Sequence, residues 1–315
     1  MRSRQSEGTH AMNDLDSAAI GFVGLGNMGQ PMALNLAKAG FRLTVYDTRA
    51  ERTRPLADLG ATVADSLADL LAGVGIVVTM LPDTPDVASV VTGPCGIEHL
   101  GRPGLLQLEM STIIPSASKR FAELLEARGM RYVDAAVGRS ALHAARGESL
   151  FMVGAHDADL VAVRPLLEAM GDTIVHCGPP GSGIAMKIVN NFQGNVQAQI
   201  TAEALVLGAR LGLSVDRMVE VMSSTLSVNG FLTGYYPLKA LTGDIEPGFA
   251  LRLANKDLSI AVNLARELGV PVTAGARAQA CVEAACTDYG DKDVTALLDA
   301  AADAAGIVPP RMAGA

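Results

Sequence analysis

The chain has 315 residues, and 49% of them are hydrophobic, so it is long enough for two domains that each bury a core. Its formal net charge of −8 opposes nonspecific binding to nucleic acid or to anionic membranes. No apolar run approaches the roughly 20 residues that a membrane-spanning helix needs. We therefore expect neither a nucleic-acid partner nor a membrane partner.

The cysteines and the first residues indicate where such a protein resides. The four cysteines form no C-x-x-C pair and have no histidine at the spacing of metal ligands. We interpret them as reduced, packed thiols of a cytoplasmic protein, and we predict no metal site. Residues 1–17 are polar, lack the apolar core of a signal peptide and contain a second methionine, Met12. We expect a disordered leader or an upstream start there.

A strand, a tight turn and a helix are predicted over residues 18–40. The turn holds three glycines in G-x-G-x-x-G spacing. The first glycine allows the sharp turn, the second lets a pyrophosphate approach the backbone, and the third lets the helix pack closely on the strand. Free N–H groups at the start of the helix then face the phosphates. The residues predicted to bind a dinucleotide here are Gly24, Gly26, Asn27, Met28 and Gly29.

A second strand, residues 42–46, ends in Asp47. This acidic residue lies near the distance of about 20 residues expected for a carboxylate on the adenosine ribose hydroxyls. A carboxylate there repels the additional phosphate of NADP and favours NAD. Arg49 argues in the other direction, because a nearby arginine accommodates a 2′-phosphate, unless its side chain is simply solvated. We predict NAD as the cofactor and consider NADP the weaker candidate.

Strands and helices alternate up to residue 180 and imply a Rossmann-type, doubly wound parallel sheet. The further strands are predicted at 76–81, 105–110, 131–137, 150–153 and 173–176, and the helices at 50–59, 66–71, 115–128 and 157–170. From Gly181 onward only helices are predicted, at 182–211, 215–223, 249–268, 272–286 and 294–304. We therefore expect a dinucleotide-binding domain at 18–180 and an all-helical domain at 181–315 that closes over the nicotinamide.

Ligands of doubly wound sheets bind beyond the carboxyl ends of the strands, and polar residues follow two of these ends. Thr112 is placed to bond nicotinamide or substrate, or alternatively to cap the next helix. Arg139 offers a planar fork that holds a carboxylate or a sulfonate through two hydrogen bonds. Its alternative is a structural ion pair with Asp134 or Glu148.

The helix that opens at 182 follows a glycine-rich turn and carries Lys187 and Asn191 one turn apart on one face. The residues around Lys187 are small or apolar, so the helix draws the ammonium partly out of water. Desolvation lowers the pKa of a lysine, as a proton donor or acceptor near neutral pH requires. A surface lysine is the alternative. Asn190 and Asn191 argue against it, because asparagine is a poor helix former.

The segment from Gly178 to Asn191 resembles the catalytic segment of the β-hydroxyacid dehydrogenases, the 3-hydroxyisobutyrate dehydrogenase superfamily. The resemblance spans about Ile20 to Leu298 and implies that Lys187 is the catalytic acid and base. It also implies that Leu81 contacts the cofactor. Lys256 is implied to reach the cofactor from the helical domain, oriented by its neighbour Asp257.

Residues 134–140 depart from the commonest pattern of this superfamily, Asp-Ala-Pro-Val-Ser-Gly-Gly, in which a serine and backbone amides hold the substrate carboxylate. The sequence Val137-Gly-Arg-Ser140 is similar instead to the branch with sulfolactaldehyde reductase and γ-hydroxybutyrate dehydrogenase, which carries Val-Gly-Arg-Thr. Gly194 is a further departure, since the sulfolactaldehyde-reducing relative has a serine there that touches substrate. Glu109 replaces the aspartate of the superfamily pattern Asp-Met-Ser-Thr-Ile.

The resemblance implies an NAD-dependent oxidoreductase that interconverts a short anionic aldehyde, of the sulfolactaldehyde or succinic semialdehyde type, and its hydroxy acid. A 3-hydroxyisobutyrate or tartronate semialdehyde dehydrogenase is the main alternative. A non-catalytic dinucleotide-binding module and an imine reductase are disfavoured, because Lys187 is retained. The residues implied to bind substrate are Thr112, Arg139, Ser140, Asn190, Asn191 and Gly194. A homodimer or homotetramer is expected, since helices 251–268 and 272–286 carry more apolar residues than a small core needs.

Overall fold

The computed structural model of the chain describes residues 19–314. The predicted leader, residues 1–17, lies outside the described residues. The chain forms two compact units, of which the first ends at Lys187 and the second begins at Ile188. The change of unit therefore falls inside one helix, α10 (Ser182–Arg210). The roles assigned to the two predicted domains stay predictions.

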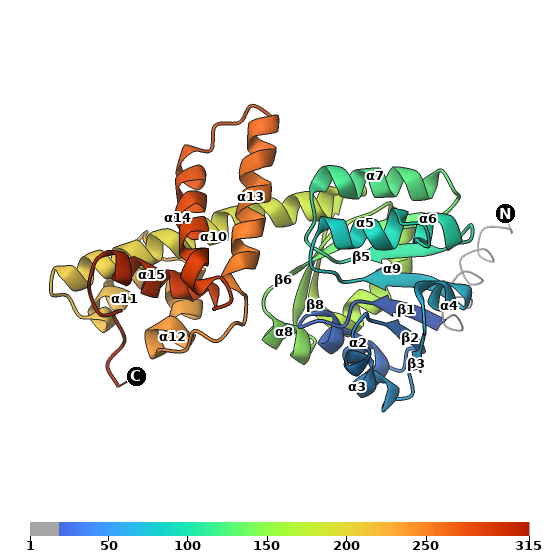
Figure 1. The fold of residues 1–315 in the computed structure, drawn as a ribbon, viewed down its shortest axis with the longest axis horizontal. Helices are drawn as coiled ribbons and strands as arrows, with labels where there is room; N and C mark the ends of the chain where they lie inside the picture. The colour runs from blue at the N-terminus through green and yellow to red at the C-terminus, as the bar shows by residue number, and fades with distance from the viewer. Residues whose placement is uncertain (1–18, 315) are drawn as a thin grey trace, which may run out of the picture. The chain divides into compact units, whose positions relative to one another are not determined.

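The first unit contains one eight-stranded sheet in the order β3-β2-β1-β4-β5-β6-β7-β8 (Figure 1). The strands are β1 (Ala19–Val23), β2 (Leu43–Tyr46), β3 (Thr62–Val63), β4 (Val74–Thr79), β5 (Leu106–Glu109), β6 (Arg131–Gly138), β7 (Ser149–Gly154) and β8 (Gly171–Gly178). Every neighbouring pair is parallel except β6 with β7. The predicted doubly wound sheet is confirmed, and this antiparallel pair is the one difference in strand direction.

The antiparallel pair has a simple cause in the length of its connection. Only residues 139–148 join β6 to β7. A parallel pair needs a crossover of about a dozen residues or more to return the chain to the same edge of the sheet. The short connection instead turns the chain back on itself.

Helices cover both faces of this sheet. They are α2 (Gly29–Lys38), α3 (Arg54–Ala57), α4 (Leu67–Ala72), α5 (Thr84–Thr92), α6 (Ile97–Leu100), α7 (Pro115–Glu126), α8 (Ala141–Arg146) and α9 (Asp157–Met170). Apolar residues of α2, α8 and α9 form a core on one face, and those of α4 to α7 form a core on the other. Figure 1 shows α5, α6 and α7 together on one side of the sheet and α2 and α3 on the opposite side. The predicted helix 50–59 is a 3-10 turn followed by α3, whereas β3, α5, α6 and α8 were not predicted.

The second unit consists of helices around a separate apolar core. Besides the rest of α10 they are α11 (Val215–Ser223), α12 (Tyr236–Leu238), α13 (Leu251–Glu267), α14 (Thr273–Tyr289) and α15 (Leu297–Ala304). Residues 188–314 contain no β-strand, and their one β-type pairing is an isolated bridge between Ala250 and Asp293. The prediction that this part of the chain is all-helical is therefore confirmed. No helix in the described part of the chain has the length and apolarity to cross a membrane.

The exposed apolar side chains of the second unit bear on the expected oligomer. Helices α13 and α14 pack against each other and place Leu251, Leu258 and Val282 in the unit's own core. Leu268 and Val270, just after α13, are 69% and 52% exposed, and the oligomer expected from these two helices stays a prediction. Further large exposed apolar residues lie on α10, on α11 and in the segments between and after these two helices, namely Val189, Ile200, Leu207, Leu211, Leu213, Val221, Leu226 and Val228.

Candidate active site

The glycine-rich turn connects β1 to α2. Gly24 has a φ of +94°, and a Cβ atom there would clash with the carbonyl oxygen of Met80. A Cβ atom at Gly29 would clash with the carbonyl oxygen of Gly24, so the absence of a side chain lets α2 begin close to the strand. At Gly26 the nearest atom to such a Cβ is Nη1 of Arg52, 3.9 Å away. This open space beside the backbone fits the approach of a pyrophosphate.

The start of α2 is also suited to an anion. Its N-cap residue is Met28, whose thioether is a poor partner for the first N–H groups of the helix. The preceding residue, Asn27, is exposed. N–H groups at such a start face outward with a partial positive charge, which phosphate oxygens satisfy.

Asp47, at the end of β2, is bonded to the same turn. Its carboxylate accepts the N–H of Leu25 at 2.7 Å and the N–H of Arg49 at 2.8 Å. Nη1 of Arg52 lies 3.6 Å from the same carboxylate. Arg52 was not identified from the sequence. In the structure its guanidinium lies beside both Gly26 and Asp47, whereas Arg49 is exposed. No spacing rule singles it out.

Leu81 lies against the glycine turn from β4. Its Cδ2 atom is 2.9 Å from the position of a Cβ on Gly24, so that side chain lines the turn. Its N–H donates to Oγ of Ser111 at 2.8 Å. Ser111 in turn donates its N–H to Glu109 at 2.7 Å. This chain of bonds ties the segment with Leu81 to the segment with Thr112, which follows Ser111 and is partly exposed.

Glu109 is fully buried at the end of β5. It accepts hydrogen bonds from Oγ1 of Thr79 at 2.7 Å and from Nε2 of Gln107 at 3.2 Å. Burial raises the pKa of Glu109 to about 7, because the charged form loses water, and the neighbouring Asp134 adds to the rise. Its hydrogen bonds act in the opposite direction.

Asp134 lies beside Glu109 on β6 and is bonded to the start of α10. Its carboxylate accepts the N–H groups of Gly181 and Ile184, the latter at 2.7 Å. Burial raises the pKa of Asp134 to about 6, although these backbone bonds lower it. Asp134 is therefore committed to α10, and the alternative in which it pairs with Arg139 is wrong.

Lys187 lies one turn after Ile184 in α10. Its residue is only 9% exposed, whereas Met186 and Val189 beside it are 46% and 64% exposed. Ile184 and Ile188 are fully or nearly fully buried, so Lys187 belongs to the buried face of the helix. The sequence expectation that this helix draws the lysine out of water agrees with its burial.

Arg139 follows β6 and has a φ of +70°, a left-handed conformation that costs an arginine roughly 1 to 2 kcal/mol. Its Nη1 lies 2.8 Å and 2.9 Å from the two carboxylate oxygens of Asp172, at the start of β8. Nη1 also donates to the backbone carbonyl of Glu148, and Nη2 to Oγ1 of Thr173 at 3.3 Å. The ion-pair partner is thus Asp172, which the sequence did not indicate, while Glu148 contributes only its carbonyl oxygen.

Ser140 and Gly194 are two further residues that the sequence predicts to bind substrate. Oγ of Ser140 lies 2.9 Å from Nδ1 of His143, so the hydroxyl next to Arg139 is held by the first turn of α8. Gly194 lies within α10, where a Cβ would make an ordinary contact of 3.7 Å with the ring of Phe231. A serine would therefore fit at this position without displacing the ring.

In the second unit, Asn191 of α10 is bonded to α13. Its Nδ2 donates to Oδ2 of the buried Asp257 at 2.6 Å. Oδ1 of the same carboxylate lies 3.4 Å from Nζ of Lys256. Asn190 is exposed and donates to Oδ1 of Asn191 at 3.2 Å. Asp257 thus joins Lys256 to Asn191, and the role of Lys256 toward the cofactor stays a prediction.

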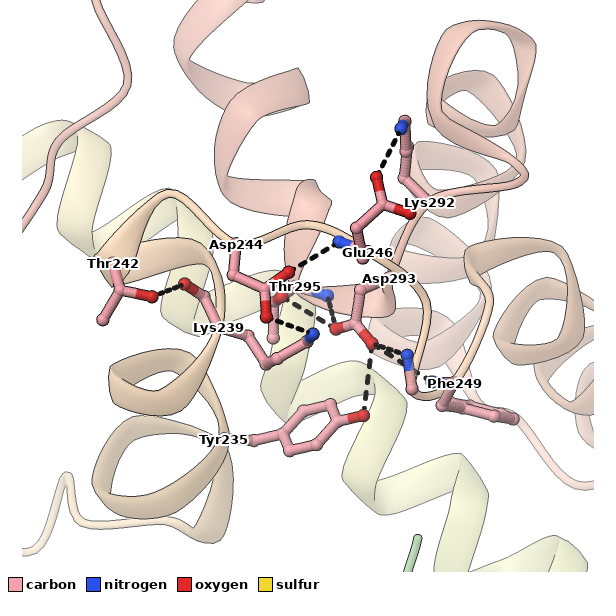
Figure 2. A network of polar contacts seen from close by, with 10 residues as sticks. Tyr235, Lys239, Thr242, Asp244, Glu246, Phe249, Lys292, Asp293 and Thr295 are labelled. Atoms are coloured by element: carbon pink, nitrogen blue, oxygen red, sulfur yellow. Dashed lines mark hydrogen bonds and ion pairs between the residues drawn. The ribbon is translucent and has the colours of Figure 1, made fainter. Parts of the chain in front are cut away.

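Figure 2 shows the polar network that holds the loop in front of α13. The buried Asp293 accepts the N–H groups of Gly248 and Phe249 through Oδ2, at 2.9 Å and 3.1 Å. The hydroxyl of Tyr235 donates to the same oxygen at 3.2 Å, and Oδ1 accepts both the N–H and the hydroxyl of Thr295. One carboxylate therefore fixes the entry to the helix that carries Lys256.

Two family models match successive parts of the chain. The model described as the NAD binding domain of 6-phosphogluconate dehydrogenase matches residues 19–178. The model described as NAD-binding of NADP-dependent 3-hydroxyisobutyrate dehydrogenase matches residues 181–301.

Several known proteins are similar to nearly the whole chain. A 3-sulfolactaldehyde reductase of Escherichia coli is 37% identical over 292 residues, which are 92% of this chain and 98% of that protein. An NAD-dependent L-serine dehydrogenase of Pseudomonas aeruginosa is 37% identical over 78% of this chain and 85% of its own length. The structure of a 3-hydroxyisobutyrate dehydrogenase of Mycobacterium tuberculosis with L-serine superimposes with a TM-score of 0.83 at 32% identity, covering 90% of this chain and 98% of that one. The chain therefore belongs to the β-hydroxyacid dehydrogenase family, and it is an oxidoreductase.

Proposed function

We propose that this protein is an NAD-dependent oxidoreductase that interconverts a short anionic aldehyde and its hydroxy acid, with Lys187 as general acid and base. The observation that carries the proposal is the placement of Lys187. It is buried on α10, one turn after Ile184, whose N–H donates to the buried carboxylate of Asp134 on β6. The open backbone at Gly26 and the carboxylate of Asp47 are the groups that would hold the dinucleotide.

The residues of the chain divide the chemistry among them. The dinucleotide supplies or accepts the hydride when bound. Lys187 donates a proton to the alkoxide oxygen as the carbonyl is reduced and takes it back during oxidation. Thr112 orients substrate or nicotinamide at the end of β5, and Asn190 and Asn191 contribute amide groups beside the lysine. Leu81 packs against the cofactor at the turn.

Arg139 and Ser140 are the proposed holders of the acid group. Arg139 keeps a strained backbone where glycine would be free of strain, and strain of this kind is often retained for function. Its partner Asp172 is about half exposed, and exposed ion pairs contribute little free energy, so an anionic substrate is able to compete for the guanidinium. The name of the E. coli relative, 3-sulfolactaldehyde reductase, supports a sulfonate or carboxylate substrate.

A second candidate is a dehydrogenase for a 3-hydroxyisobutyrate or tartronate semialdehyde type of substrate. The pairing of Arg139 with Asp172 favours this second candidate. If the guanidinium stays bonded to Asp172, the acid group of the substrate must be bound by hydrogen-bond donors other than Arg139. Initial rates with sulfolactaldehyde, succinic semialdehyde, tartronate semialdehyde and the corresponding alcohols separate the two. The highest kcat/KM with 3-hydroxyisobutyrate or tartronate semialdehyde would overturn our first choice.

We expect NADH to be preferred over NADPH by about tenfold or more in kcat/KM, a difference of about 1.4 kcal/mol. The reason is the carboxylate of Asp47 at the ribose position. Arg52→Ala should widen this preference, because it removes the cation beside Asp47, and Asp47→Asn should narrow it. Steady-state kinetics with both cofactors provides the measurement. Better use of NADPH by the unaltered enzyme would show that Arg49 or Arg52 dominates.

We also propose that the protein is a homodimer or homotetramer through the exposed apolar residues of α10 and α11. Leu207 and Leu211 are 63% and 71% exposed and lie one turn apart. Light scattering at micromolar concentration should give a mass of at least two chains, and the double substitution Leu207→Glu with Leu211→Glu should give the mass of one. Val161→Glu, at a 67% exposed position of α9, is the matched control and should leave the mass unchanged. A monomer in the unaltered protein contradicts the proposal.

A further inference from the structure

Two buried carboxyl groups lie side by side below the carboxyl edge of the sheet. Glu109 of β5 and Asp134 of β6 are register partners on neighbouring parallel strands, and each is fully buried. Side chains alternate along a strand, so these two share the face occupied by Thr79, Gln107 and Tyr132. This is the face on which Ile184, from the first turn of α10, joins the apolar core.

Each carboxyl holds backbone N–H groups of a segment that carries a proposed functional residue. Asp134 accepts from Gly181 and Ile184, the first turn of the helix with Lys187. Glu109 accepts from the N–H of Ser111, whose hydroxyl accepts the N–H of Leu81. The same glutamate is bonded to Thr79 and Gln107, which fixes its own rotamer.

We propose that Asp134 and Glu109 are positioning residues. Asp134 sets the place of Lys187 by holding the start of α10, and Glu109 sets the place of Leu81 and Thr112 by holding Ser111. The roles of these held residues rest on the proposed function. The bonds themselves are independent of it.

Ionisation decides how well Asp134 performs this role. An ionised carboxylate accepts hydrogen bonds through both oxygens. When one oxygen is protonated, its O–H is itself a donor and no longer suits the N–H group that it faces. The pKa of Asp134 is raised to about 6, so its protonation falls within a measurable pH range. The other titratable groups of its surroundings are Glu109, Tyr132 and Cys177, with Lys119 of α7 beside Gly181 and Lys187 further along α10. The pKa values of Tyr132 and Cys177 are raised, so both stay neutral below pH 8.

The first test uses Asp134→Asn, because the asparagine side chain has nearly the same shape as aspartate. Its single oxygen accepts a hydrogen bond from only one of the two N–H groups, and its NH₂ group then faces the other N–H without an acceptor between them. We expect kcat to fall by about tenfold with the KM for NADH nearly unchanged, the scale of one displaced catalytic group. The fall of kcat/KM on the acid side has an apparent pKa near 6 that belongs to the coupled pair, and it should shift in this variant because only Glu109 is left to titrate. Backbone amides of residues 181–187 should exchange hydrogen about tenfold faster.

Glu109→Gln has a different expected signature. The Kd for NADH, from a fluorescence titration without turnover, should rise several-fold, and amides of residues 111–113 should exchange faster. Ser118→Ala is the matched control for both variants. This substitution removes the buried hydrogen bond of 2.9 Å between Ser118 and the Tyr132 hydroxyl, which lies on the same face of the sheet. It leaves intact every hydrogen bond between an N–H group and the two carboxyl groups. It should leave the pH profile and these exchange rates unchanged.

The unaltered enzyme provides a measurement that does not depend on a variant's folding. Protection of the Gly181 and Ile184 amides against exchange, corrected for the intrinsic pH dependence, should decrease as the pH falls through about 6. Constant protection from pH 5 to 8, or an acid limb that is unchanged in folded Asp134→Asn, would overturn the proposal. Full activity of Lys187→Ala would instead overturn the role of the lysine and leave the exchange results as evidence that the carboxyls hold these segments.

Discussion

Replacing Lys187 by alanine should lower kcat by about 100-fold or more, the usual scale for the loss of a general acid and base. The side chain lies on the buried face of α10, in a residue that is only 9% exposed, where water is a poor substitute for the ammonium. NADH binding should be nearly unchanged, because the groups proposed to hold the dinucleotide lie at the turn after β1. Stopped-flow turnover and a fluorescence titration of NADH measure the two effects separately.

Lys187→Arg is the control that separates charge from proton transfer. Arginine keeps the positive charge but stays protonated at any pH the protein survives. Loss of activity in both variants supports proton transfer by Lys187. Near-normal turnover of Lys187→Ala, in a protein whose unfolding temperature is unchanged, removes the lysine from the mechanism.

Arg139→Ala should raise the KM for anionic aldehydes by roughly 10- to 100-fold, because a charge-assisted hydrogen-bonded pair contributes about 1.5 to 3 kcal/mol. Turnover of an uncharged aldehyde of similar length should change little, since it does not use this contact. Arg139→Lys should restore only part of the affinity, because an ammonium does not form the same two-pronged contact. Initial rates over a range of charged and uncharged aldehydes provide the measurement.

Asp172→Asn is the matched control for Arg139. Both substitutions break the same ion pair, but only the loss of the arginine removes the proposed anchor. If Arg139 binds substrate, Asp172→Asn should leave the KM for anionic aldehydes equal or lower, because the guanidinium is released from its competitor. An equal rise of KM in both variants, on charged and uncharged substrates alike, would show that the ion pair is structural and that the acid group is held elsewhere.

Local sequence patterns were sufficient for much of the first unit. The G-x-G-x-x-G spacing predicted a turn whose glycines are required by close backbone contacts, as at Gly24 and Gly29. The small and apolar residues around Lys187 predicted that its ammonium is drawn partly out of water, and Lys187 is buried. Both results depend on residues within one or two turns of each other, where covalent geometry and helical period fix which side chains share a face.

Partners far apart in the sequence were decided by the tertiary structure. Arg139 pairs with Asp172 rather than Asp134 or Glu148, because β7 turns back antiparallel to β6 and brings the start of β8 to the end of β6. Asp134 accepts N–H groups at the start of α10, and Arg52 lies beside the glycine turn. Both contacts result from packing between distant segments, which the local sequence pattern does not predict. The sequence by itself determined the fold class, the glycine turn and the apolar surroundings of Lys187, because those follow from local patterns. Only the tertiary structure decided which carboxylate each cation and each N–H group meets, because strand register and helix packing set those distances.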